Sequence, residues 1–345
     1  MGKLTYKDAG VDIDAQDDAL AGAKDAIRSS FTPGVLGDVG LFGGLFDPAR
    51  MGLGDAILVA TADGVGTKLD VAKRAGVYDG VGRDLVQHCI NDVLVQGARP
   101  LFFLDYAAMG KLEPEVISAL IRGCAESCRD HGLALLGGET AEMPGLYQGG
   151  DFELVGFLVG AVKREHLIDG SKLAEGQVLV GLGSDGLHTN GYSLARRILF
   201  DLGELELADR PEDLGGASVQ EALLAPHRAY HGSLLPLIEE GLVAGLAHIT
   251  GGGLAGNVVR ILPKGLDAWI DRTAWEQPAL FRALVARGKL ETDEAFRAFN
   301  MGIGMVVAVE AGDVDDVRTR LEASGETTCV VGELRSGTGE VRWIA

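Results

Sequence analysis

The sequence predicts an α/β (α+β) protein of two domains. The chain has 345 residues, a length that suits two domains, and 47 % of them are apolar, enough for a sizeable core. From residue 56 onward, strand-like and helix-like patterns alternate. A polar junction, Asp169-Gly170-Ser171, divides these patterns into two series. We therefore expect one domain over residues 1–170 and a second over residues 171–345.

The first 50 residues carry few periodic signals and many glycines, five of them between Pro33 and Pro48. Two interpretations stay open for this segment. It is either a mobile, strand-poor segment that closes over a ligand, or a surface loop with several turns.

The remaining elements follow from apolar runs and helical periodicity. Strands are expected over residues 56–61, 100–104, 133–136 and 152–162, and helices over residues 81–97 and 113–131. The second domain begins with a strand over residues 178–182, followed by a helix near Tyr192 and another over residues 254–262. The two halves are similar in length but show no convincing internal repeat.

Charge and cysteine usage exclude several classes of function. The net charge is −19 without any block of lysines or arginines, which argues against a nucleic-acid partner. The four cysteines form no C-x-x-C pair, so we expect reduced thiols in the core. The N-terminus has no signal-peptide pattern, and no apolar run reaches the roughly 18 residues of a membrane span. A cytoplasmic protein without membrane contact is expected.

The most informative stretch is Gly137-Gly138-Glu139-Thr140-Ala141-Glu142-Met143-Pro144-Gly145. It follows an apolar run, so it predicts a loop at the end of a buried strand. Glycines there let the backbone approach a ligand closely. Carboxylates in such a place need a cation or hydrogen-bond donors. The stretch is therefore predicted to form one wall of a site.

A second loop, residues 61–68, follows the first predicted strand. Gly64 and Gly66 expose backbone N–H groups that suit phosphate oxygens, and Thr67 precedes a helix. Asp63 can bind a metal ion, and Lys68 can meet phosphate charge. The loop is not a Walker A motif. On this pattern alone, a turn with a helix cap explains the loop as well as a ligand site does.

The helix predicted over residues 81–97 carries polar residues on one arc, namely Asp84, His88, Asn91 and Asp92. The opposite arc is apolar and is expected to face a core. One interpretation is a solvated helix face. The alternative is that Asn91 and Asp92 point into a ligand site.

Asp63, Asp105 and Glu139 each follow a predicted strand. Ligands of open α/β sheets gather beyond the carboxyl ends of strands. Hard cations prefer carboxylate oxygens. Three acidic residues in equivalent positions therefore predict a site for Mg²⁺ or a magnesium nucleotide.

Residues 181–186 form a formal G-x-G-x-x-G pattern after a strand. A dinucleotide-binding fingerprint would open its helix at the third glycine, whereas here His188-Thr189-Asn190-Gly191 intervenes. An NAD-dependent oxidoreductase is thus a minor alternative. The intervening residues place several hydrogen-bonding side chains in one turn.

Thr250, Gly251, Gly252 and Gly253 precede another predicted helix. Glycines at a helix N-terminus form an anion-binding cradle. A plain tight turn is the alternative for this motif.

Together, these motifs resemble the phosphoribosylformylglycinamidine cyclo-ligase (AIR synthetase) family. The resemblance begins at Tyr6-Lys7-Asp8-Ala9-Gly10-Val11-Asp12 and extends through residues 61–68, 91–92, 97–106, 137–145, 188–193, 248–253 and 299–304. It covers almost the whole chain in the family's order.

The resemblance implies an activity and an assembly. The enzyme would use ATP to close the imidazole ring of 5-aminoimidazole ribonucleotide from formylglycinamidine ribonucleotide, releasing ADP and phosphate. The subunit would form a homodimer in which the two N-terminal sheets join into a barrel. The C-terminal part would be a separate α/β sandwich-like domain.

The resemblance also implies roles for individual residues. Asp63, Asp92, Asp105 and Glu139 would hold Mg²⁺ and ATP, together with Asn91. Gly64, Gly66, Thr67 and Lys68 would meet phosphates, and Lys7 would reach them from the N-terminal segment. Glu142, His188, Thr189 and Asn190 would line the substrate side, with Lys68, His188 and Asn190 as the catalytic candidates. Thr250, Gly251, Gly252 and Gly253 would cradle an anion of the substrate.

Relatives in the same superfamily are the main rivals. A selenophosphate synthetase usually carries a reactive cysteine near its N-terminus, whereas the first cysteine here is Cys89. A thiamine-phosphate kinase lacks the pattern of residues 139–145. A non-enzymatic nucleotide-binding protein on this scaffold would be expected to have lost the acidic residues that this chain retains.

Overall fold

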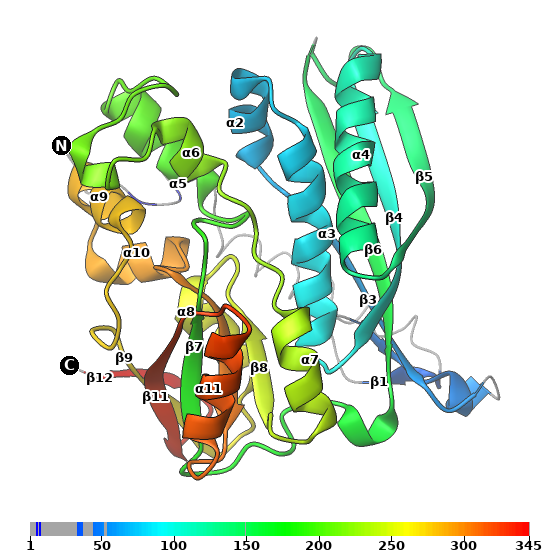
Figure 1. Ribbon diagram of the computed structural model, residues 1–345, viewed down its shortest axis with the longest axis vertical. Helices are drawn as coiled ribbons and strands as arrows, with labels where there is room; N and C mark the ends of the chain where they lie inside the picture. The colour runs from blue at the N-terminus through cyan, green and yellow to red at the C-terminus, as the bar shows by residue number, and fades with distance from the viewer. Residues whose placement is uncertain are drawn as a thin grey trace.

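The computed structural model describes Thr5, Lys7 and residues 33–36, 44–51, 54–148 and 150–344. Within these residues the chain builds two six-stranded sheets, one after the other along the sequence (Figure 1). Helices pack on both sheets, which confirms the α/β (α+β) class. Most of the segment over residues 1–50, including its predicted closure over a ligand, lies outside the described residues.

The first sheet has the strand order β1-β2-β3-β6-β4-β5. Strand β6 is antiparallel to both β3 and β4, and β4 is parallel to β5, so β3, β4 and β5 all run in one direction. The elements of this part are β1 (Val35–Leu36), β2 (Gly44–Phe46), η2 (Pro48–Met51), β3 (Ile57–Gly64), α2 (Lys68–Ala75), α3 (Asp79–Leu94), β4 (Arg99–Met109), α4 (Pro114–Asp130), β5 (Ala134–Glu142), β6 (Phe152–Val162) and η3 (Arg164–His166).

Helices α3 and α4 cover one face of this sheet (Figure 1). They pack closely because each presents a glycine to the other's backbone. A Cβ atom at Gly82 would lie 2.2 Å from the carbonyl oxygen of Leu120, and one at Gly123 would lie 2.1 Å from that of Asp79. A larger residue at either position would therefore separate the helices.

The other face of the first sheet carries large exposed apolar side chains. Leu136 is 64 % exposed, Phe157 46 % and Leu104 38 %. Along β6, Leu154 and Leu158 face the helices and are buried, so Phe157, between them, faces the open side. This open face is large and apolar enough to suggest a protein partner.

The second sheet has the order β12-β9-β11-β7-β10-β8. All its neighbouring strands are antiparallel except β9 and β12. Its elements are β7 (Val178–Gly183), α5 (Tyr192–Arg196), η4 (Arg197–Leu202), η5 (Glu212–Leu214), α6 (Val219–Leu223), α7 (His231–Glu239), β8 (Gly245–His248), α8 (Gly253–Val258), η6 (Val259–Ile261), β9 (Leu266–Asp271), α9 (Ala279–Gly288), α10 (Thr292–Ala298), β10 (Ile303–Val309), α11 (Val314–Ala323), β11 (Thr328–Ser336) and β12 (Val341–Ile344).

Two apolar clusters show that this second sheet is covered on both faces. Helices α7 and α11 pack on one face, against residues such as Val180 and Val307. Helices α5, α8, α9 and α10 pack on the other, against residues such as Leu179 and Val306. The alternation of these neighbours along β7 and β10 is the period of two expected for strands. The C-terminal part is thus a sandwich of helices around a sheet.

Several predicted boundaries were wrong. Strand β4 extends to Met109, so Asp105 lies within a strand rather than after it. Strand β5 extends to Glu142, so most of the predicted loop over residues 137–145 is strand. Pairing with β4 over residues 102–109 holds these glycine-rich residues in the sheet. Helix α3 ends at Leu94, and the helix predicted over residues 254–262 divides into α8 and the short η6.

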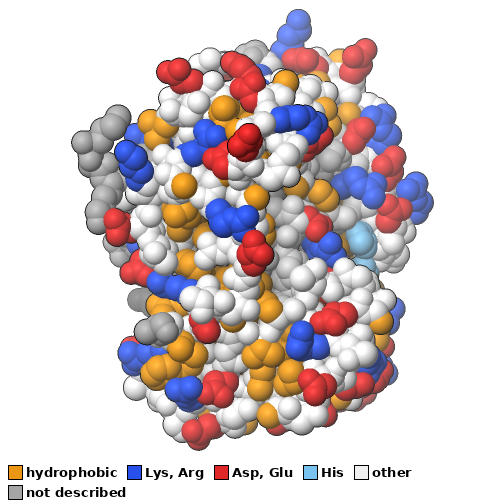
Figure 2. Space-filling view, turned by 60° about the vertical axis from the view of Figure 1, so that its left-hand side comes forward, with side chains coloured by type: hydrophobic (Ala, Val, Ile, Leu, Met, Phe, Trp, Pro, Cys, Tyr) orange, Lys and Arg blue, Asp and Glu red, His pale blue; other side chains and the backbone are white. Residues whose placement is uncertain are grey.

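The cysteines are reduced, as expected from the sequence, and the described residues form no basic patch on the face in Figure 2. All four cysteines, each in the described part, are free, and Cys89, Cys124 and Cys128 are buried. Burial raises the pKa of the Cys128 thiol to about 12. On the face in Figure 2, lysine and arginine side chains are interspersed with acidic ones rather than gathered in one patch. Among the described residues, no helix is long and apolar enough to cross a membrane.

Candidate active site

The predicted motifs converge where the two halves of the chain meet. Helices α2 and α3 lie between the first sheet and the second half of the chain (Figure 1). Thr67, at the start of α2, places its Oγ1 3.0 Å from Oγ of Ser193. Thr189 Oγ1 lies 2.7 Å from Nδ1 of His88 on α3. The loop 61–68 and the loop 188–193 are therefore in direct contact.

Lys68 is fully buried at this junction. Its Nζ lies 2.5 Å from Oδ2 of Asp84 on α3, and it donates to the carbonyl oxygens of His188 at 3.2 Å and Ala225 at 2.7 Å. These three acceptors use all three N–H groups of the ammonium. Lys68 thus joins α2 to α3 and to two loops of the second half. The sequence had predicted that Lys68 meets a phosphate. In the structure its ammonium group is instead surrounded by protein acceptors.

The polar arc of α3 is buried, so the interpretation as a solvated face was wrong. Asp84, His88, Asn91 and Asp92 all face the second half of the chain. Asn91 donates from Nδ2 to the carbonyl oxygen of Arg228 at 2.8 Å, and its Oδ1 accepts from the N–H of Tyr230 at 3.0 Å. Asn91 therefore binds protein backbone rather than presenting a free amide to a nucleotide.

Asp63 and Asp92 approach the same histidine from two elements. Nε2 of His88 lies 2.6 Å from Oδ2 of Asp63 and 3.6 Å from Oδ2 of Asp92. Asp92 also accepts from Thr61 Oγ1 at 3.1 Å and lies 2.9 Å from His248 Nδ1. Both oxygens of Asp92 are thus occupied by protein groups.

Asp63 differs from Asp92 because its side chain is 41 % exposed. Its Oδ1 accepts from the N–H of Gly64 at 2.7 Å. Burial acts to raise its pKa, but the charge and hydrogen bond of His88 outweigh this and lower it. Burial also acts to lower the pKa of His88, yet Asp63 and Asp92 raise it to about 9. Asp63 is therefore an ionised carboxylate with an open side, as a hard cation requires.

Asp105 and Glu139 do not join Asp63 around one point. One row of paired residues crosses the sheet from Asp63 on β3, through Gly156 on β6 and Asp105 on β4, to Gly138 on β5. The Cα atoms of Asp63 and Asp105 are thus about 10 Å apart, two strand spacings. Glu139 follows Gly138, so it points to the opposite face of the sheet. Burial raises the pKa of Asp105, which faces α4.

Glu142 is exposed at the end of β5, where Oε1 accepts from the N–H of Leu112 at 2.8 Å. Side chains of a strand alternate, so Glu142 and Glu139 point to opposite faces of β5. The structure places neither of them beside the loop 188–193. The predicted four-carboxylate metal site is therefore not assembled within one chain.

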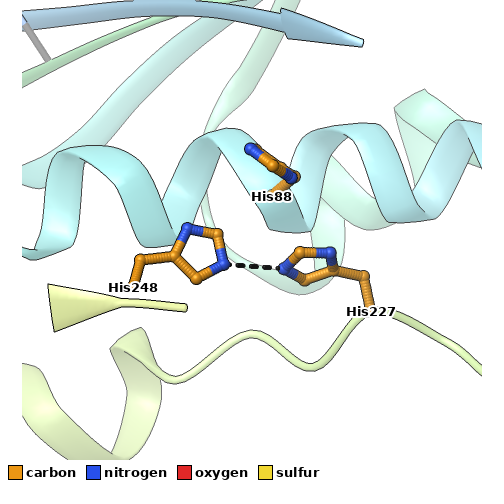
Figure 3. Close-up of side chains that lie close together, drawn as sticks. All are labelled: His88, His227 and His248. Atoms are coloured by element: carbon orange, nitrogen blue, oxygen red, sulfur yellow. Dashed lines mark hydrogen bonds between the residues drawn. The ribbon is translucent and has the colours of Figure 1, made fainter. Parts of the chain in front are cut away.

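Four histidines gather between the two halves, and Figure 3 shows three of them. Their ring centroids are 5.1 Å apart for His88 and His227, 5.0 Å for His88 and His248, and 5.2 Å for His227 and His248. The ring of His188 stacks on His227 at 4.2 Å. Burial, followed by the neighbouring cationic groups, holds the pKa of His188 and His227 well below the usual range. Burial also lowers the pKa of His248.

His188 is neutral, as a general base must be, but a substrate cannot reach its side chain in this conformation. Its imidazole is neutral, and its Nε2 accepts from the N–H of Arg228 at 3.4 Å. The side chain is 1 % exposed, beneath the stacked His227. A substrate could reach it only after the surrounding loops move, so its catalytic role stays a prediction.

The loop 188–193 also meets the glycine-rich loop 250–253. Asn190 donates from Nδ2 to Thr189 Oγ1 at 3.4 Å, and a Cβ atom on Gly251 would lie 3.4 Å from Asn190 Oδ1. A Cβ atom on Gly253 would lie 1.8 Å from the carbonyl oxygen of Phe296, so close backbone packing requires glycine there. Thr250 donates to Oδ1 of Asn257, whose Nδ2 bridges the carbonyl oxygens of residues 250, 251 and 253.

Sequence reasoning missed the loop between α6 and α7, which supplies His227 and Arg228. Arg228 pairs with Asp185 at 2.7 Å and with Glu326 at 3.2 Å. No motif or spacing marks these residues, because their partners lie 43 and 98 positions away.

A cationic pocket of about 690 Å³ lies beside these loops. It opens between α2 and the segment formed by α5 and η4. Asp70 pairs with two of its arginines, at 2.8 Å each. Apart from Thr67, which the resemblance assigned to phosphates, the pocket lining was also missed from sequence; its residues are Thr67, Arg74, Ser193, Arg196, Arg197, Phe200, Asp201 and Leu202. Three arginines and two hydroxyl groups suit a phosphate group.

The chain matches two models of one protein family. Residues 45–162 match "AIR synthase related protein, N-terminal domain", and residues 174–344 match "AIR synthase related protein, C-terminal domain". Solved structures below 25 % identity share the fold. A thiamine-monophosphate kinase from Stenotrophomonas maltophilia K279a has a TM-score of 0.64 and 21 % identity, over 94 % of this chain and 95 % of that one. T. maritima PurL complexed with FGAR has a TM-score of 0.60 and 20 % identity, over 94 % of this chain and 48 % of that one.

Curated relatives are far more similar. A phosphoribosylformylglycinamidine cyclo-ligase of Geobacter metallireducens is 50 % identical over 99 % of this chain and 99 % of its own length. The enzyme of that name from Trichlorobacter lovleyi is 48 % identical over 97 % and 95 %, and one from Desulfitobacterium hafniense is 50 % identical over 97 % and 98 %. With both domain models matched and identity near one half over almost its whole length, the chain belongs to the phosphoribosylformylglycinamidine cyclo-ligase family.

Proposed function

We propose that the protein catalyses the ATP-dependent closure of formylglycinamidine ribonucleotide to 5-aminoimidazole ribonucleotide, with release of ADP and phosphate, in purine biosynthesis. The observation that carries this proposal is the near-full-length identity of about one half to enzymes of that name. The thiamine-monophosphate kinase shares the fold at 21 % identity, which supports no common substrate.

The chemistry requires activation of a poor leaving group. ATP transfers its terminal phosphoryl group to the formamide oxygen of the substrate, and ADP leaves. The internal amidine nitrogen then attacks the activated carbon, and expulsion of phosphate completes the ring. Catalysis of such steps depends mainly on positioning and on stabilising the charge of the transferred group.

Residues 1–170 would supply the ATP and metal side of the site, and residues 171–345 would complete it. Asp63 fits Mg²⁺ best, because its carboxylate is ionised and partly exposed. When bound, Mg²⁺ would neutralise charge on the phosphate oxygens of ATP. Lys68 and Asn91 would act by fixing α2 and α3 against the loops at 188–193 and 225–230. Thr189, Asn190, Glu142 and residues 250–253 stay predicted substrate contacts, and Lys7 a predicted phosphate contact.

The proposed activity has a direct test. The purified protein, given ATP, Mg²⁺ and formylglycinamidine ribonucleotide, should form ADP, phosphate and the aminoimidazole in equal amounts. The same preparation should not phosphorylate thiamine phosphate or consume selenide. A folded protein that leaves the ribonucleotide unchanged would overturn the proposal.

The cationic pocket supports a phosphate contact, so replacement of Arg197 tests it. We expect Arg197→Met to raise the KM of one substrate about tenfold, the loss of roughly one charge-assisted hydrogen bond. Steady-state kinetics with each substrate varied in turn would show whether the pocket holds ATP or the ribonucleotide. Arg282→Met, which alters an exposed arginine of α9, should leave both KM values unchanged. Unchanged KM values for Arg197→Met would show that the pocket holds neither phosphate.

The open face of the first sheet supports a homodimer. Its exposed Leu136, Phe157 and Leu104 would be covered if two such faces joined, as the family resemblance implies for a barrel. Edge strand β5 would then also gain a neighbour.

Phe157→Asp should convert this dimer to monomers, because it places a carboxylate in the apolar contact. Sedimentation velocity at micromolar concentration would measure the change. Leu202→Asp, at a residue 48 % exposed on the second half, serves as the control and should stay dimeric. A monomeric wild type, or a Phe157→Asp variant that remains dimeric, would disprove this interface.

A further inference from the structure

The cluster of His88, His227 and His248 is not used by the proposed reaction. Its members come from α3, from the loop before α7 and from the end of β8, so it joins both halves of the chain (Figure 3). All three side chains are buried. Each can offer one nitrogen such that these three atoms lie within 4.8 Å of one another.

The Nε2 atoms of His227 and His248 meet at the centre of this cluster. The Asn91 amide is oriented by Tyr230 and Arg228, so its NH₂ group lies 3.2 Å from Nε2 of His227. His248 Nδ1 lies 2.9 Å from the Asp92 carboxylate and must donate, so a neutral His248 carries its lone pair on Nε2. These two Nε2 atoms are 3.1 Å apart. At that distance either one Nε2–H group donates to the other nitrogen, or both nitrogens bind the same cation.

The third histidine adds a second sign of an incomplete site. Nε2 of His88 lies 2.6 Å from Asp63 but forms no aligned hydrogen bond, although it is buried. Its Nδ1 lies 2.7 Å from Thr189 Oγ1, which is 3.3 Å from Nδ1 of His227. One nitrogen of His88 already lies within 4.8 Å of the ligand nitrogens of the other two histidines.

The separation of His227 and His248 suits a tetrahedral transition-metal site. Zn–N bonds of about 2.0–2.1 Å place two ligand nitrogens of a tetrahedron roughly 3.3 Å apart. The Nε2 atoms of His227 and His248 are already 3.1 Å apart. The contact from His248 Nδ1 to Asp92 is the carboxylate–histidine arrangement that orients metal-binding imidazoles. Imidazole nitrogens select Zn²⁺ and its neighbours over Mg²⁺.

We propose that His88, His227 and His248 bind one transition-metal ion of the Zn²⁺ class, with the carboxylate of Asp63 beside it, and that His88 releases its proton to solvent when the ion binds. The ion ties α3 to the loop 225–230 and to β8, and so fixes the two halves of the chain relative to each other. Its ligands are mainly nitrogens of the buried junction, whereas the Mg²⁺ that accompanies ATP would be held by carboxylate oxygen, and Asp63 would lie next to both ions.

The test uses the full chain, without affinity-tag histidines, after chelator treatment and removal of the chelator. Titration with ZnCl₂ against a chromophoric competitor should give one equivalent bound per chain, and Zn²⁺ should raise the Tm. Substitution with Co²⁺ should give the intense visible absorption of four-coordinate nitrogen ligation. A chain that takes up no Zn²⁺, or Co²⁺ with only weak six-coordinate absorption, would overturn the proposal.

Variants locate the ion. His227→Gln keeps a hydrogen-bonding side chain but removes one ligand, and should weaken Zn²⁺ binding at least about 100-fold. His88→Gln should do the same and serves if His227→Gln does not fold. His131→Gln is the control, because His131 belongs to a separate pair with His231, 4.9 Å between ring centroids. Equal Zn²⁺ affinity in the wild type and both cluster variants would show that the ion binds elsewhere and would overturn the proposal.

Discussion

The Asp63→Asn variant is expected to turn over at least about 100-fold more slowly than the wild type. Even changes to residues that only hydrogen-bond to metal ligands reduce metal affinity or activity about 10–100-fold. The substitution keeps the shape of the side chain and the acceptor for the N–H of Gly64. It removes the charge that a bound Mg²⁺ needs and that holds His88 in its charged form. Steady-state turnover with saturating ATP, measured over a range of Mg²⁺ concentrations, would quantify the loss.

Two comparisons separate this loss from damage to the fold. The thermal unfolding of Asp63→Asn should show a single transition, because a partly exposed carboxylate is replaced by an isosteric amide. Asp55→Asn, at an exposed residue just before β3, is the matched control and should retain full turnover. Turnover within about tenfold of wild type, or 1.4 kcal/mol of barrier, would show that Asp63 is not a metal ligand.

Local patterns were sufficient to place several elements in both halves. The mostly apolar run over residues 152–162 predicted β6 at its observed bounds. The start of β7 at Val178 and of α5 at Tyr192 also agreed with the sequence. These elements are determined by burial of their own side chains, which periodicity records directly.

Pairing between distant residues explains what the sequence could not show. Strands β4 and β5 lengthen each other through pairing, and this holds Gly137 and Gly138 in a strand despite their low propensity. The polar arc of α3 looked solvated because its partners lie far away in the sequence: His88 contacts Thr189 101 positions on, and Asp92 contacts His248 156 positions on. Such contacts depend on how two domains pack, which no local pattern reveals.

Lys68 illustrates the same limit and gives the largest expected effect on stability. Its position after a glycine-rich loop indicated a phosphate ligand, whereas the structure shows a buried ion pair with Asp84. Lys68→Met should lower the free energy of unfolding by about 3–5 kcal/mol, because it leaves a buried carboxylate without its cation. Burial already raises the pKa of Asp84 in spite of Lys68. Chemical denaturation of the full chain would measure the difference.

The loss of stability in Lys68→Met should come from the unpaired charge of Asp84 rather than from the missing lysine side chain itself. The double variant Lys68→Met/Asp84→Asn leaves no buried charge, and the carboxamide introduced on α3 would still offer an acceptor to the N–H of His227. It should therefore recover most of the stability lost by the single variant. Lys73 lies on the same helix as Lys68 and forms an exposed ion pair with Asp151. Lys73→Met breaks this pair and should lower the free energy of unfolding by less than about 1 kcal/mol. If Lys68→Met instead unfolds like wild type while the KM for ATP rises, Lys68 binds a phosphate, and the ion pair with Asp84 must open during the reaction.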